Sequence, residues 1–204
     1  QLHRSPGVFF ETANNRTYFL GKIIPYRGSW VEFEYDQKNI LYVRIDRKRK
    51  FLGTIFLRAL GLRSDEEILR TFYTVDRIAL RDQKLYWTLE PGVERATNLL
   101  GLKLSHRVTK GSEEIAHAGR KVTASVLKEI QKAKVSEIEV ELGDLEGAFT
   151  VADVVDTDTG EVLLEANTEI TADKLSKFLD AGVAEIQVFF PERDDVGTVI
   201  SQTL

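Results

Sequence analysis

Apolar and polar residues alternate along two neighbouring segments near the start of the chain. The apolar positions fall at every second residue: Val31, Phe33 and Tyr35, then Leu41, Val43 and Ile45. Residues 36–39, Asp-Gln-Lys-Asn, separate the two segments and are typical of turns. Because successive side chains of a strand point to opposite faces, this pattern predicts a β-hairpin.

Two short helices are predicted after this hairpin. Apolar residues spaced by four over residues 55–60 indicate the first helix, and Gly61 stands where a glycine commonly follows a helix. Ser64 and Glu67 then form the S-x-x-E pattern of a capping box, in which each side chain bonds to the other residue's backbone N–H. We expect the second helix to end near Tyr73, where the first module ends.

The rest of the chain contains two copies of one helix–strand unit, at residues 119–142 and 167–190. Each copy offers a threonine as helix N-cap, an apolar pair on the helix and an alternating strand. These positions are Thr123, Leu127, Ile130, Ile138, Val140 and Leu142 in the first copy, and Thr171, Leu175, Phe178, Ile186, Val188 and Phe190 in the second. Residues 77–89 are strand-like, and residues 149–165 predict a hairpin that turns at 156–160. The module is therefore expected to be a compact α+β unit.

The net charge of −4 hides two segments of opposite sign. Residues 1–75 hold 13 Lys and Arg against 8 Asp and Glu, a net charge of +5, whereas residues 76–204 hold 15 against 24, a net charge of −9. Opposite signs favour two modules with different neighbours, of which only the basic one suits nucleic acid. The alternative is that both are solvated surfaces without a special role.

The sequence lacks the motifs of common catalytic and metal sites. It has no cysteine, and its three histidines are scattered. Asp156, Asp158 and Gly160 are spaced unlike the residues of an EF-hand loop, and a polar turn explains them better. No phosphate-binding loop, nucleophile elbow or membrane-spanning apolar run is present. With no methionine even at position 1, we expect an internal piece of a longer protein.

The basic module carries a set of residues suited to single-stranded nucleic acid. Trp30 follows the small residues Gly28 and Ser29, Arg4 lies in a segment turned by Pro and Gly, and Asp46 and Arg47 lead a basic run. Aromatic rings stack on bases, and guanidinium groups bind phosphates or base edges. The alternatives are a core tryptophan that opens a strand and a solvated basic turn.

Several segments resemble the β subunit of bacterial RNA polymerase. They are Gln-Leu-His-Arg-Ser-Pro-Gly-Val at 1–8, Ile-Pro-Tyr-Arg-Gly-Ser-Trp at 24–30, Val-Arg-Ile-Asp-Arg-Lys-Arg-Lys at 43–50 and Leu-Arg-Ala-Leu-Gly at 57–61. The resemblance implies an α+β fold, with residues 1–73 as the first part of the mixed β2 lobe. Residues 74–196 would be a lineage-specific insertion that carries the repeat, and residues 197–204 the return to the lobe.

The same resemblance implies a role in transcription. In the family, the lobe forms one wall of the cleft around downstream DNA, and the residues matching Arg4, Trp30, Asp46 and Arg47 lie near the non-template strand. The residue matching Gln1 lies at the edge of the rifamycin pocket. The family's catalytic magnesium is held by the β′ subunit, so this fragment of a nucleotidyltransferase would hold no cofactor and no catalytic residue.

Implied partners are the β′, α and ω subunits, the sigma factor and DNA, in the cytoplasm near the nucleoid and away from membranes. The alternative function, from a different class, is a stand-alone protein-interaction module built on the duplicated α+β unit.

Overall fold

The computed structural model describes residues 4–13, 18–89 and 98–204. Its internal contacts divide the chain into two units, one made of residues 1–72 with 196–204 and the other of residues 73–195. Both units combine antiparallel sheets with short helices, which confirms the α+β class. The unit bounds fall next to the boundaries expected at 73 and 196, while the assignment of the second unit as an insertion stays a prediction.

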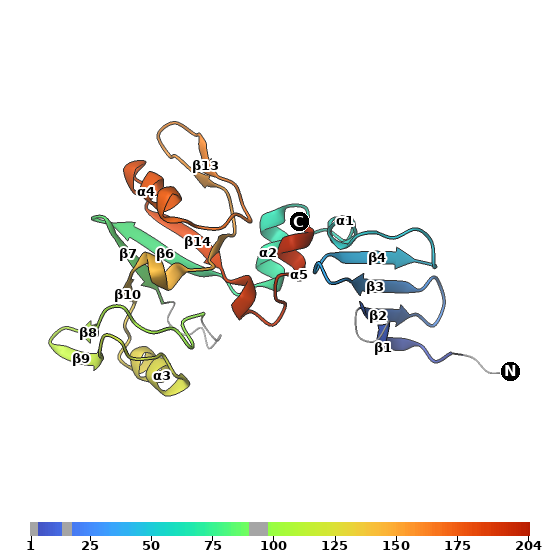
Figure 1. Ribbon diagram of the computed structural model, residues 1–204, viewed down its shortest axis with the longest axis horizontal. Coiled ribbons are helices and arrows are strands. Elements are labelled where there is room, and N and C mark those ends of the chain that lie inside the picture. Colours follow the sequence, from blue (N-terminus) through green and yellow to red (C-terminus); the bar gives the residue numbers. More distant parts are fainter. Residues whose placement is uncertain (1–3, 14–17, 90–97) are drawn as a thin grey trace. The chain divides into compact units, whose positions relative to one another are not determined.

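The first unit is built on a five-stranded antiparallel meander (Figure 1). Its strands, adjacent in chain order, are β1 (Gly7–Ala13), β2 (Tyr18–Ile24), β3 (Val31–Tyr35), β4 (Leu41–Ile45) and β5 (Phe51–Leu52). The predicted hairpin is β3–β4, with Val31 paired to Ile45, and is confirmed. All five residues of β3 are half-buried, so the alternation of apolar and charged residues along this strand does not separate a buried face from an exposed one. Ion pairs such as that of Lys50 with Glu34 help to cover its charged face.

Both helices predicted for this unit are present, with the expected end signals. Helix α1 (Gly53–Ala59) is followed by Gly61, whose φ of 117° is the left-handed conformation that closes a helix. Helix α2 (Asp65–Phe72) begins with the capping box: the Glu67 N–H donates to Ser64 Oγ at 3.1 Å, and the Ser64 N–H donates to Glu67 Oε2 at 3.3 Å. These ends form from bonds within a few residues, which is why sequence patterns located them.

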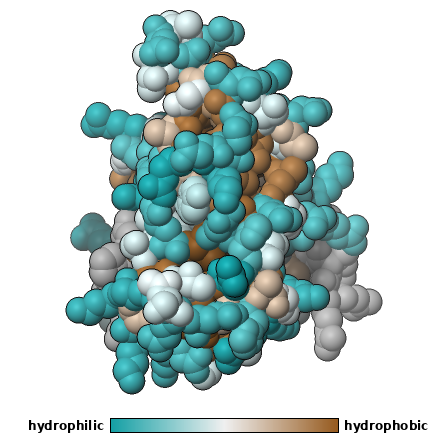
Figure 2. All heavy atoms as spheres, turned by 90° about the vertical axis from the view of Figure 1, so that its left-hand side faces the viewer, coloured by the Kyte–Doolittle hydropathy of each residue, from teal (hydrophilic) through white to brown (hydrophobic). Residues whose placement is uncertain are grey.

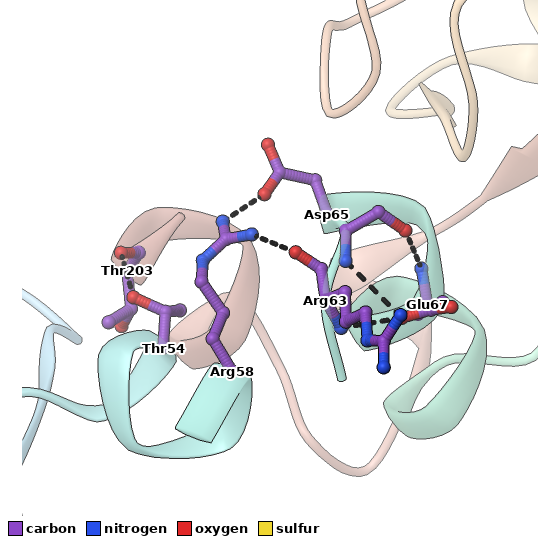
Figure 3. A network of polar contacts seen from close by, with 7 residues as sticks. Thr54, Arg58, Arg63, Asp65, Glu67 and Thr203 are labelled. Carbon is purple, nitrogen blue, oxygen red and sulfur yellow. Dashed lines mark hydrogen bonds and ion pairs between the residues drawn. The ribbon is translucent and has the colours of Figure 1, made fainter. Parts of the chain in front are cut away.

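Helix α5 (Val199–Thr203) completes the first unit by lying against α1 and α2 (Figure 1). Thr203 Oγ1 accepts the backbone N–H of Leu41 at 2.8 Å, and Thr54 Oγ1 donates to the Thr203 carbonyl at 3.4 Å. Figure 3 shows this contact beside Arg58, which bridges from α1 to the start of α2. The last residues of the chain are thereby tied to β4 and α1, about 150 residues earlier in the sequence.

The second unit is organised around a second five-stranded antiparallel sheet of order β10-β7-β6-β14-β11. Its strands are β6 (Asp76–Arg81), β7 (Lys84–Thr88), β10 (Glu137–Val140), β11 (Phe149–Thr150) and β14 (Glu185–Phe189). Helices α3 (Ala124–Lys132) and α4 (Ala172–Asp180) precede β10 and β14, so each predicted repeat copy is a helix followed by a strand. Both strands end earlier than predicted, because Leu142 and Phe190 lie beyond their last residues. The copies flank the β6–β7 hairpin on its two sides, and their apolar helix positions are buried.

The predicted N-caps of the repeat differ from one another. Thr123 caps α3, because its Oγ1 accepts the Val126 N–H at 3.4 Å. Thr171 occupies the N-cap position of α4, but its side chain accepts no helix N–H. The prediction of two equivalent threonine caps is therefore wrong for the second copy in its hydrogen bond, although right in position.

Short elements complete the second unit. They are the strand pairs β8 (Val108–Lys110) with β9 (Glu113–Ala116) and β12 (Val154–Val155) with β13 (Val162–Leu164), and the 3-10 helices η1 (Leu142–Leu145) and η2 (Pro191–Arg193). The predicted hairpin between the repeats is β12–β13. In its turn, the Asp156 carboxylate accepts the N–H groups of Asp158 and Thr159 at 2.8 and 3.2 Å, which lowers the pKa of Asp156. This carboxylate serves the turn.

A polar group lies in the core of the second unit. The buried carboxylate of Asp76 accepts from Trp87 Nε1 at 3.1 Å and from Asn98 Nδ2 at 2.7 Å, and burial raises its pKa. The Trp87 ring stacks on Phe190 at 5.5 Å, and the Arg193 guanidinium lies 4.1 Å from the centre of the Phe190 ring. Both hydrogen-bond acceptors of the carboxylate are satisfied, as a buried carboxylate requires.

Candidate nucleic-acid interface

The structure brings three of the predicted site residues together around one aromatic ring. Trp30 directly precedes β3 and is half-buried, so part of its ring remains accessible. The guanidinium carbon of Arg4 lies 4.9 Å from the Trp30 ring centre, and that of Arg47 lies 5.3 Å from it. Both distances are within the range of cation–π attraction. Two residues that are distant from each other in sequence, Arg4 and Arg47, thus converge on Trp30.

The turn that carries Asp46 and Arg47 has an unusual backbone. Their φ angles are 54° and 58°, and the Lys48 N–H donates to the Ile45 carbonyl at 3.1 Å, which closes a tight turn after β4. Both central residues adopt the left-handed conformation. In turns of this type glycine is preferred at the second central position, which Arg47 occupies here. The Asp46 N–H donates to the Trp30 carbonyl at 2.9 Å. This bond fixes the turn to the tryptophan, while the Asp46 side chain is exposed.

The basic run after β4 divides into paired and available cations. Lys50 Nζ donates to Glu34 at 2.8 Å and lies 4.1 Å from the Tyr42 ring centre, and the bond to Glu34 raises the pKa of Lys50. Over the described parts of the chain, the exposed side chains of Arg47, Lys48 and Arg49 form no ion pair with a carboxylate. These three cations are therefore available to an external anion.

The loop between β2 and β3 presents a second aromatic side chain. Tyr26 is 96% exposed and is followed by the exposed Arg27. Gly28 has a φ of 126°, which turns the backbone toward Trp30. Trp30 is predicted from the sequence as a site residue of this loop, whereas Tyr26 is not. An aromatic residue between Pro and Arg in a turn was the available signal, but it does not distinguish an exposed ring from a buried one.

The predicted rifamycin-pocket residue, Gln1, lies outside the described residues, so its assignment stays a prediction. Among residues 4–13, 18–89 and 98–204, no group of three or more His, Cys, Asp or Glu side chains could hold a metal ion. In the same ranges, no helix combines the length and apolar character needed to cross a bilayer.

The acidic strand of the second unit is electrostatically different from the Trp30 site. Both glutamates of β10 are paired with cations, Glu137 with Arg81 and Glu139 with Lys84 at 2.8 Å, and Glu141, just after the strand, lies 3.2 Å from the His106 ring nitrogen Nε2. The Lys84 bond lowers the pKa of Glu139. The face drawn in Figure 2 is predominantly hydrophilic, and hydrophobic side chains are visible only between polar ones. The second unit as a whole carries a net charge of −9, which disfavours contact with a polyanion.

Comparison with known proteins gives one consistent family. The family model described as "RNA polymerase Rpb2, domain 2" matches residues 4–141, and so extends from the first unit into the second. The chain is 83% identical over 205 residues to a DNA-directed RNA polymerase subunit beta of Koribacter versatilis (strain Ellin345), and 61% identical to that of Solibacter usitatus (strain Ellin6076). Each match covers 100% of this chain and 14% of the relative. The chain therefore belongs to the RNA polymerase Rpb2 domain 2 family, as a segment of a bacterial RNA polymerase β subunit.

Proposed function

We propose that this segment helps to form the downstream DNA cleft of RNA polymerase and binds the non-template strand during transcription. The observation that supports this function best is the convergence of Arg4 and Arg47 on the half-buried ring of Trp30. The combination provides one surface for an unpaired base and two cations for the phosphates beside it.

The geometry suggests how the site changes when DNA enters. Two guanidinium groups near one ring repel each other, and a phosphate relieves this repulsion by drawing one of them away. The ring that it leaves becomes available for stacking by a base, which contributes about 1–3 kcal/mol. Asp46 can accept a hydrogen bond only, so its exposed carboxylate is suited to an amino group on a base edge.

The rest of the assignment follows from the proposed parent enzyme. Its other partners are the β′, α and ω subunits and the sigma factor, in the cytoplasm near the nucleoid. We assign the catalytic magnesium to β′ and no catalytic residue to this chain. The match to 14% of each longer relative favours a segment of a large subunit over a stand-alone interaction module.

The test uses RNA polymerase assembled with the full-length β subunit. Trp30→Ala is expected to shorten the lifetime of the promoter open complex by about 5- to 150-fold, which corresponds to the loss of one stacked base. Single abasic sites are then scanned along the non-template strand. At the position that Trp30 contacts, an abasic site should shorten the wild-type lifetime and leave the Trp30→Ala lifetime unchanged.

Charge variants provide the matched control. Arg47→Ala should reduce the slope of log affinity against log salt concentration by about 1, because one phosphate contact is lost. Lys50→Ala should not change this slope, since Lys50 is already paired with Glu34. If all abasic positions affect both polymerases equally, or if both charge variants change the slope alike, the proposed site is wrong.

A further inference from the structure

One face of the first unit's sheet is apolar and open to solvent over β1 and β2. The register places Val8 opposite Ile23, and Phe10 opposite Gly21, so these side chains share a face with Phe19. The exposed fractions are 85% for Phe10, 59% for Val8, 45% for Phe19 and 41% for Ile23. Contiguous exposed apolar surface of this kind marks a site of contact with another element.

The same face is hollowed at the border between its exposed part, over β1 and β2, and the part over β3 and β4 that helix α1 covers. A cavity of about 510 Å³ is lined on its apolar side by Phe10, Phe19, Phe33, Tyr35 and Leu41. Toward β3 and β4, helix α1 covers the face, with Phe56 packed edge-on against Phe33 at 5.7 Å. The cavity is therefore the continuation of a core that α1 covers on one side only.

The end of the chain lies at the rim of this cavity. Thr203 accepts the backbone N–H of Leu41, which lines the cavity, so the polypeptide leaves α5 beside the open face. The relatives that contain this segment are much longer, since it covers 14% of them. A charged partner such as nucleic acid does not fit, because the lining is apolar apart from few polar groups, among them Glu11, whose charge is negative.

We propose that the stretch of the β subunit that follows Leu204 packs apolar side chains into this cavity and covers the β1–β2 face. The exposed face of the lobe's sheet is thus covered by a later part of the same polypeptide. This inference does not rest on the proposed contact with DNA, although β1 begins three residues after Arg4 and its packing would also hold Arg4 near Trp30.

Oxidative footprinting of the isolated full-length β subunit tests whether the face is covered within one polypeptide. Phe10 should be about tenfold less reactive in the native subunit than in the urea-unfolded subunit, because packing removes nearly all of its solvent access. Tyr26, 96% exposed and on the loop after β2, is the internal control and should remain reactive. A reactive Phe10 in the isolated subunit overturns the proposal, whether or not assembly into polymerase later protects it.

A photocrosslinker identifies the occupant. p-Benzoylphenylalanine in place of Phe10 should crosslink to residues shortly after Leu204 in the same polypeptide. The same group in place of Phe9, which is on the opposite face of β1, should not form this product. A crosslink from position 10 to a second copy, to another subunit, to DNA or to a distant part of the same chain would overturn the proposal.

Discussion

Ile138 and Ile186, 48 residues apart in the chain, occupy equivalent places on the two sides of one hairpin. Ile138 pairs with Trp87 of β7, Ile186 pairs with Ile78 of β6, and Trp87 and Ile78 pair with each other. The row crosses four strands, and none of the four side chains is more than 2% exposed. Two copies of the helix–strand unit suffice because the β6–β7 hairpin separates them and each copy covers one of its edges.

The two tryptophans should respond differently to truncation. Trp87 is fully buried and hydrogen-bonded, so Trp87→Ala is expected to lower the free energy of unfolding of the second unit by about 3–5 kcal/mol. Trp30→Ala should cost distinctly less, since Trp30 is only half-buried. Urea unfolding of the chain, followed by circular dichroism, measures both. Equal losses would identify Trp30 as a core residue and remove the main support for the stacking role.

Replacement by glycine should destabilise the chain less at Arg47 than at Arg49. Arg47 has a φ of 58°, so Arg47→Gly relieves a left-handed strain of about 1 kcal/mol that offsets the extra entropy of the unfolded chain. Its effect on stability should stay within about 0.5 kcal/mol. Arg49→Gly removes the same charge at a residue whose φ is not positive, and should lower the free energy of unfolding by about 0.5–1 kcal/mol. Chemical unfolding of both variants decides, and an equal loss would contradict the strain at Arg47.

The two repeat copies provide a matched test of helix capping. Thr123→Ala should destabilise the second unit by about 1 kcal/mol, because the Val126 N–H loses its acceptor. Thr171→Ala should cost clearly less, since the Thr171 side chain accepts no helix N–H. Thermal unfolding monitored by circular dichroism compares them. A larger loss at Thr171 would show that the capping difference is absent in solution.

Asp76 should make stability depend on pH in a characteristic direction. Burial raises the pKa of this carboxyl above its ordinary 3.8, so between the unfolded-state and the folded-state pKa the folded form holds a proton that the unfolded form releases. The free energy of unfolding of the wild type minus that of Asp76→Asn should therefore rise as pH falls through the folded pKa. It should level off below about 3.8. Urea titrations from pH 7 to 3 give this difference, and a decrease toward acid would contradict the raised pKa.

Short-range patterns in the sequence were enough to locate several elements. The capping box of Ser64 and Glu67, the glycine after α1 and the β3–β4 turn each form from bonds between residues at most a few positions apart. The helix–strand repeat was equally visible, because two copies with the same apolar period must form the same element. Where a local pattern needs no distant partner, the sequence alone determined the structure.

The tertiary structure decided how these elements combine. Arg4 and Arg47 meet at Trp30 because the sheet brings segments from three parts of the chain to one place. Asp76 is buried because Trp87 and Asn98 supply its hydrogen bonds. Burial depends on which elements pack over a residue, and that packing energy is summed over contacts distant in sequence. Local periodicity therefore identified strands and helices, while only the assembled sheets could place the ring, the cations and the open apolar face.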